Sequence, residues 1–193
     1  MYQIILASGS PRRKEILEQA GVVFTVCPSQ KNEVIKSQEP EEVVKELSLM
    51  KATDIAEKAP VNSIIVGADT VVSNAGHILG KPKDELEAVQ MIMNLQGHSH
   101  KVYTGVSIIV KHEDDTTDIR QFVEGTKVRI ADITKEEAME YSLTKEPMDK
   151  AGAYAIQGKF AKYVQAIEGD YYNVVGFPIA RFRVEMQRLG FQI

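Results

Sequence analysis

Short apolar segments alternate along the chain with segments of helical pattern, and this alternation is what most constrains the fold. Apolar or alternating runs bounded by turn residues predict strands, whereas apolar residues spaced three and four apart predict helices. The predicted strands cover residues 2–7, 22–27, 62–73, 101–111, 119–132 and, less regularly, 159–167. The predicted helices cover residues 11–20, 40–58, 85–96, a segment after Thr134 and a last segment after Pro178.

Helix start signals support these boundaries. Ser10 with Pro11 is an N-cap and first-turn pair, and Asp84 with Glu87 and Thr134 with Glu137 have the spacing of capping boxes. The acidic connection 112–118 between two alternating segments predicts a hairpin. Strands that interleave with helices but include a hairpin indicate an α/β protein with a mixed sheet.

Composition narrows the classes of partner and compartment. Twenty-three Lys and Arg against 27 Asp and Glu give a formal charge of −4, so the chain lacks the overall basic field expected of a protein that binds nucleic-acid polymers or an anionic membrane. The single cysteine, Cys27, excludes an internal disulfide. No apolar run approaches the length of a membrane helix, and the N-terminal pattern is not that of a secretion signal, so we expect a cytoplasmic protein.

The segment from Ser8 to Arg13 places two arginines in the first turn of a predicted helix. Cations are disfavoured at that pole of a helix, but a bound anion would reverse the sign. The segment therefore predicts either a phosphate site or an ordinary Ser-Pro cap with solvated arginines. Lys51 falls inside the apolar stripe of its helix, which indicates an anionic partner or a side chain that extends along the surface.

Asp69 lies inside the apolar run 64–72 with no basic neighbour in sequence. A carboxylate held in a strand is a candidate catalytic group, and the alternative is a local turn after Gly67. Residues 76–82 lack the spacing of a P-loop, but Lys81 on this turn is a candidate phosphate contact. His98 and His100 share a strand face, and two ligands make only a weak metal site.

No serine or cysteine has the pattern of a nucleophile, and the polar, glycine-bearing segments 145–158 and 169–176 have no helical period. The chemically informative residues are thus cations and isolated carboxylates. This set suits a polyphosphate substrate with a divalent ion better than acyl or redox chemistry.

Taken together, five blocks closely resemble the Maf family of nucleotide pyrophosphatases over essentially the whole chain. These blocks are residues 8–13, 67–70, 80–82, 145–158 and 169–178. The resemblance implies one Maf-like domain over residues 1–193, with a mixed sheet flanked by helices, two lobes around a deep central cleft, and an architecture like that of the inosine triphosphate pyrophosphatases. It also implies a cytoplasmic enzyme, often a homodimer, that needs a divalent cation such as Mg²⁺ or Mn²⁺.

The resemblance implies the following roles. Asp69 matches the proton acceptor that activates water, and with Glu33 it is a candidate metal ligand. Residues that match substrate-binding positions are Ser8, Arg13, Glu33, Lys51 and Lys81. Residues that match base-selective positions, in the combination of the branch acting on dTTP and UTP, are Arg12, Thr70 and Gln157. Asn32 and His98 depart from the family, which often has an Asp and an Arg there.

The leading hypothesis is therefore a pyrophosphatase that converts dTTP, UTP and modified pyrimidine nucleotides to monophosphates and pyrophosphate. One alternative, from the history of the family name, is a regulatory nucleotide-binding protein that inhibits septum formation. Another is a house-cleaning pyrophosphatase directed at purines. A pyrophosphate assay across a panel of triphosphates separates the three.

Overall fold

The computed structural model describes residues 2–193, which form two compact units. Unit 1 comprises the chain up to Asp69 together with Thr104–Glu124 and Gly176–Ile193, and unit 2 comprises Thr70–Tyr103 and Gly125–Val175. Each unit has its own apolar core. No helix within residues 2–193 has both the length and the apolar character needed to cross a membrane.

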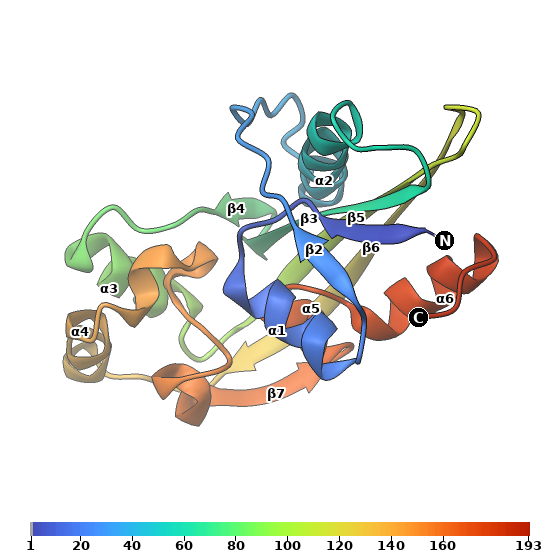
Figure 1. Cartoon of the computed structure of the whole chain (residues 1–193). Helices are drawn as coiled ribbons and strands as arrows, with labels where there is room; N and C mark the ends of the chain where they lie inside the picture. Colours follow the sequence, from blue (N-terminus) through green and yellow to red (C-terminus); the bar gives the residue numbers. More distant parts are fainter. Residues whose placement is uncertain (1) are drawn as a thin grey trace. The chain divides into compact units, whose positions relative to one another are not determined.

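A seven-stranded mixed sheet runs in the order β2-β1-β3-β5-β6-β7, with β4 paired to β3 (Figure 1). The strands are β1 (Gln3–Leu6), β2 (Phe24–Val26), β3 (Ser63–Asn74), β4 (His77–Leu79), β5 (Ser99–Lys111), β6 (Thr117–Ile130) and β7 (Val164–Glu168). β1 pairs in parallel with β2 and β3, whereas β4 pairs antiparallel to β3 and β7 antiparallel to β6. The prediction of an α/β protein with a mixed sheet is confirmed.

Six α-helices and three short 3₁₀ helices complete the described part of the chain. The α-helices are α1 (Pro11–Gln19), α2 (Pro40–Ala56), α3 (Glu85–Leu95), α4 (Lys135–Leu143), α5 (Tyr171–Val175) and α6 (Ile179–Arg188). The 3₁₀ helices are Glu146–Asp149, Ala151–Ala153 and Lys159–Tyr163.

Helix α2 lies against β3 and β5 through two glycines of unit 1 (Figure 1). A Cβ atom on Gly67 would meet the backbone of Ser48 and lie 2.8 Å from the amide nitrogen of Ala52, and one on Gly105 would meet the carbonyl of Val44. Side chains there would push the helix off the sheet. The close approach buries an apolar cluster formed by Ile5, Ala7, Ala52, Ile55, Ala59, Ile65 and Ile109.

The helix caps are partly as predicted. Thr134 and Glu137 form the full capping box of α4. Asp84 caps α3 by accepting a hydrogen bond from the Glu87 amide. The Glu87 carboxylate accepts from the amide of Lys83 and not from that of the N-cap residue Asp84, so the capping box is incomplete. Ser10 is the N-cap of α1 by position, yet its side chain makes no capping bond.

One predicted strand was wrong in part, and two short elements were not predicted. Residues 159–163 form a 3₁₀ helix, and only Val164–Glu168 of the predicted strand 159–167 is extended with its neighbour. The reason is that Phe160 and Tyr163, three residues apart, both point into the aromatic core of unit 2. β4 and α5 were not predicted, because three and five residues are too few to establish a period.

Candidate active site

Lys51 and Asp69 meet because α2 packs closely against the strand β3 at Gly67. Ser48, Lys51 and Ala52 lie on one face of α2, since residues three and four apart share a face. Gly67 and Asp69 lie on one face of β3, since alternate strand residues do. Ser48 and Ala52 touch the backbone at Gly67, so Lys51 reaches Asp69 two residues further along the strand.

The Lys51 ammonium is shared by two carboxylates. It contacts Oδ1 of Asp69 and lies 2.9 Å from Oε1 of Glu33. The side chains of Lys51 and Asp69 are 17% and 14% exposed, whereas that of Glu33, from the irregular segment after β2, is 52% exposed. The alternative of a lysine extended over the surface is thereby replaced by a partly buried ion-pair cluster.

Arg13 is the buried cation of this site. Its Nη1 donates to Oγ of Ser8 at 2.8 Å and its Nε donates to the carbonyl of Gly176 at 2.9 Å. Burial lowers the pKa of Arg13, while the charges of Asp69 and Glu33 raise it and that of Arg12 lowers it. The guanidinium keeps its charge, as arginine side chains do in proteins.

Five predicted residues thus come together in unit 1: Ser8, Arg13, Glu33, Lys51 and Asp69. Arg12 is half-buried beside them in α1 and acts on Arg13 through its charge. Sequence reasoning missed the carbonyl of Gly176, which orients Arg13 across 163 residues. Gly176 lies in one of the blocks that resemble the family, so its segment could have been singled out. Its role could not, because any residue type has a backbone carbonyl.

Three predicted residues belong to unit 2. Thr70 follows Asp69 on β3 and is half-buried, while Lys81 and Gln157 are exposed. The turn that carries Lys81 is tied to the segment that carries Gln157, because the Gly152 amide donates to the carbonyl of Gly80 at 3.0 Å. The assignment of Thr70, Lys81 and Gln157 to the substrate site stays a prediction.

Glu146 closes the segment that carries Gln157. Its Oε1 accepts from the hydroxyl of Tyr141 at 2.9 Å and its Oε2 accepts from the amide of Lys159 at 3.1 Å. Gly158, at φ 130°, lies so near this carboxylate that a Cβ atom would be 2.7 Å from it. The segment 145–158, predicted to have no helical period, contains two short 3₁₀ helices and is pinned at both ends within unit 2.

The histidine pair does not form a metal site in the described residues. His98 is exposed, whereas His100 is 3% exposed and its Nε2 lies 2.7 Å from the hydroxyl of Tyr154. Burial lowers the pKa of His100 to about 4, so it is neutral at physiological pH. Across residues 2–193, no group of three or more His, Cys, Asp or Glu side chains is arranged to hold a metal by itself.

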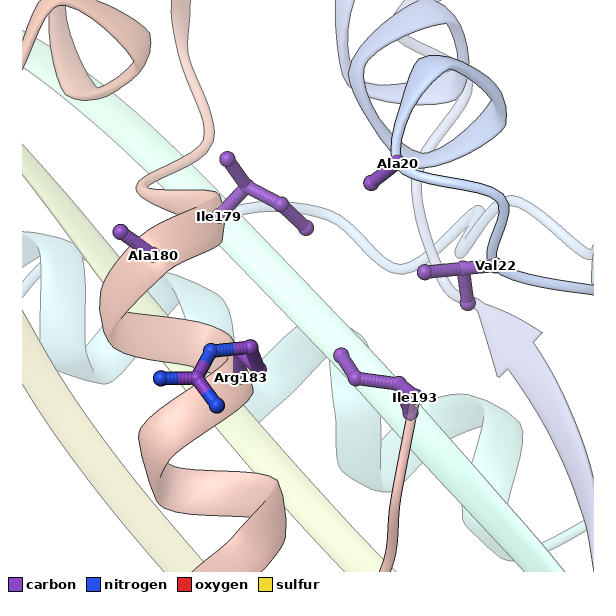
Figure 2. A pocket seen from close by; sticks show the side chains of 6 residues that line it. All are labelled: Ala20, Val22, Ile179, Ala180, Arg183 and Ile193. Carbon is purple, nitrogen blue, oxygen red and sulfur yellow. The ribbon is translucent and has the colours of Figure 1, made fainter.

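A small cavity of about 140 Å³ lies elsewhere in unit 1 (Figure 2). It is lined by Ala20, Val22, Ile179, Ala180, Arg183 and Ile193. None of these lining residues is a predicted site residue, and the lining is mostly apolar. The cavity therefore offers no polyphosphate site, and the deep cleft implied by the resemblance stays a prediction.

Comparison with known proteins shows which family the chain belongs to. The chain is 53% identical over its full length to the dTTP/UTP pyrophosphatase of Lachnoclostridium phytofermentans, of which it covers 98%. It is 45% identical over its full length to the dTTP/UTP pyrophosphatase of Agathobacter rectalis, of which it covers 100%. It is 47% identical over its full length to the dTTP/UTP pyrophosphatase of Bacillus cereus strain AH820, of which it covers 98%.

Solved structures also match the chain. The Ham1 protein of Staphylococcus aureus matches with a TM-score of 0.47 and 12% identity, over 97% of this chain and 99% of that one. A HAM1 protein from Coxiella burnetii matches with a TM-score of 0.46 and 16% identity, over 68% of this chain and 74% of that one. The family model described as Maf-like protein matches residues 3–189, and the chain belongs to the Maf family.

Proposed function

We propose that this protein is a nucleoside triphosphate pyrophosphatase that hydrolyses dTTP and UTP to the monophosphate and pyrophosphate. The observation that carries the proposal is the cluster in unit 1, in which Asp69 is held by Lys51 beside the buried Arg13. Relatives with the printed name dTTP/UTP pyrophosphatase, at 45–53% identity over the full chain, support the choice of substrate.

In this mechanism Asp69 accepts a proton from the attacking water. The water oxygen bonds to one phosphorus of the α–β anhydride, the bond from that phosphorus to the bridging oxygen breaks, and the monophosphate and pyrophosphate separate. Arg13 and Lys51 neutralise charge on the phosphate oxygens, which is worth most where the donors are held in place beforehand. The two hydrogen bonds of Arg13, to Ser8 and Gly176, provide that fixed orientation.

A divalent cation fits the donor set of the site. Mg²⁺ is commonly held by one or two carboxylates together with substrate phosphates and water, rather than by an all-protein cage. Glu33 and Asp69 already share one cation, Lys51, so their oxygens converge on a common position. We therefore assign these two carboxylates as ligands of Mg²⁺ or Mn²⁺, which when bound supplies charge neutralisation at the phosphates.

Base selection is proposed to rest on Arg12, Thr70 and Gln157, with Lys81 as a further phosphate contact. The pinned segment around Glu146 supports this part of the proposal, since a selective side chain needs a fixed backbone. A homodimer, a cytoplasmic location and two lobes of one catalytic domain stay predictions.

The test is a panel assay. Purified protein is incubated with Mg²⁺ or Mn²⁺ and each of the common nucleoside triphosphates, and released pyrophosphate is measured. We expect dTTP and UTP to give the highest kcat/KM. Preference for a purine would favour purine house-cleaning, and absence of turnover with every triphosphate would favour a regulatory binding protein; either result overturns the proposal.

A further inference from the structure

Lys51 has two proposed partners in the site of unit 1, the carboxylates and the substrate phosphates. The Lys51 ammonium pairs with both Glu33 and Asp69, the two carboxylates assigned to the divalent cation. It is also one of the cations assigned to the substrate phosphates. A single ammonium on a flexible four-carbon stem exchanges readily between partners of similar charge.

The charge balance of the described cluster opposes a metal ion that arrives alone. Three cations, Arg12, Arg13 and Lys51, act on the same small region as the two carboxylates. A divalent cation without nucleotide would have to displace Lys51 and would add to the excess of positive charge. A polyphosphate, by contrast, meets that excess directly and offers Lys51 another anionic partner.

The two partners of Lys51 differ in exposure and in backbone structure. Asp69 is held on β3, while Glu33 is half-exposed on the irregular segment 27–39. α2 is fixed against the sheet by Gly67 and Gly105, so an exchange moves side chains and leaves the helix in place. The site can therefore pass from a lysine-bridged to a metal-bridged arrangement with local movement alone.

We propose that Lys51 bridges Glu33 and Asp69 in the nucleotide-free protein and moves to the phosphates when the substrate binds, so that metal and nucleotide each promote the binding of the other. This inference rests on the proposed function of the site. Coupling of this kind is reciprocal, because each ligand favours the arrangement that the other needs. Lys51 thereby keeps the site from holding a metal ion in the absence of substrate.

The proposal makes opposite predictions for two ligands measured separately on the Lys51→Met variant. Mn²⁺ binding without nucleotide, measured by calorimetry or by the spectrum of free Mn²⁺, is expected to tighten about tenfold, within the usual range of coupling. Binding of inorganic tripolyphosphate in the presence of EDTA is expected to weaken about tenfold. A merely structural role for Lys51 would weaken both or neither.

Three controls separate a specific role of the Lys51 charge from a general effect of the substitution. Lys51→Arg preserves the charge and should change both affinities less than Lys51→Met does. Lys58→Met breaks an ion pair of a lysine with a partly buried carboxylate outside the site, that with Asp54 at 2.8 Å, and should change neither affinity. Circular dichroism establishes that each variant is folded, and Lys51→Gln replaces Lys51→Met if the latter is not.

The inference and the proposed function fail in different ways. Mn²⁺ binding that is unchanged or weaker in folded Lys51→Met overturns the inference, whatever the substrate. Tripolyphosphate binding that is unchanged in the variant overturns it as well. Since neither measurement involves a nucleobase or turnover, a negative pyrophosphate assay would overturn the proposed function and leave this test intact.

Discussion

Two clusters in unit 1 pair carboxylates with cationic side chains, and they differ in how many cations each carboxylate has. Glu185 on α6 is fully buried and accepts hydrogen bonds from Arg120 at 2.6 Å, Arg188 at 2.8 Å and Arg181 at 3.2 Å. Asp69 is 14% exposed and shares the single ammonium of Lys51 with Glu33. One cluster has three planar donors for one acid, and the other has two acids for one flexible donor.

The contrast separates a structural ion cluster from a working one. Burial alone would raise the pKa of Glu185, but the hydrogen bonds from Arg120, Arg181 and Arg188 outweigh it and lower that pKa. The carboxylate is closed off from solvent by burial, and its bond to Arg120 attaches α6 to β6. The acids around Lys51 retain exposed oxygens, so they can exchange partners when an anion or a metal ion enters.

The largest expected effect is on turnover, from Asp69→Asn. Loss of a general base lowers rates by 10²–10⁴, and we expect kcat/KM for dTTP to fall about a thousandfold. The free energy of unfolding should change by less than about 1 kcal/mol, because the site is partly exposed and Lys51 keeps Glu33 as a counter-charge. Pyrophosphate release and urea unfolding measure the two quantities.

The matched control for this change is Asp54→Asn. The Asp54 side chain is 10% exposed and also pairs with a lysine, Lys58, but it lies outside the proposed site. It should leave pyrophosphate release unchanged. Native-like turnover in Asp69→Asn would remove Asp69 from the role of base.

A change of stability without a change of chemistry is expected from Glu185→Gln. Removing one member of a buried ion cluster costs about 3 kcal/mol, because the remaining partners lose their counter-charge. Urea unfolding should detect this, while kcat per folded molecule stays that of the native protein. Glu18→Gln, which loses only a half-exposed pair with Lys14, should cost less than about 0.5 kcal/mol. Equal costs at Glu185 and Glu18 would show that the buried ion cluster adds no more stability than an exposed ion pair does.

A smaller effect extends the comparison to unit 2, where His100 is buried without any charged partner. Because burial lowers its pKa from 6.5 to about 4, the unfolded chain takes up a proton at higher pH than the folded protein does. The free energy of unfolding therefore decreases as pH falls below 6.5, by about 2 kcal/mol between pH 7 and pH 5. His100→Gln should remove this share of the pH dependence.

Tyr154→Phe tests the cause of that shift. The variant removes the hydroxyl at Nε2 but leaves His100 buried, so the pH dependence of urea unfolding should persist. If Tyr154→Phe flattens the profile as much as His100→Gln does, the hydrogen bond and not burial controls the titration of His100.

Much of the fold could be predicted from local pattern. The capping box of Thr134 and Glu137, the start of α2 at Pro40 and the long strand around Asp69 follow from residues within a few positions of one another. The 3₁₀ helix Lys159–Tyr163 could not be predicted, because its conformation depends on where Phe160 packs among distant aromatic residues. The candidate site divides in the same way.

The sequence by itself determined that this chain alternates strands and helices and carries an isolated carboxylate in a strand. It also determined that cations lie in the first turn of a helix and within the apolar stripe of another. These are properties of residue type and local period. Only the tertiary structure decided that Lys51 pairs with Asp69 and Glu33, and that Arg13 is oriented by Gly176. Such pairings depend on how closely Gly67 and Gly105 let α2 approach the sheet and on which strands become neighbours, and distances across the fold are not encoded in local spacing.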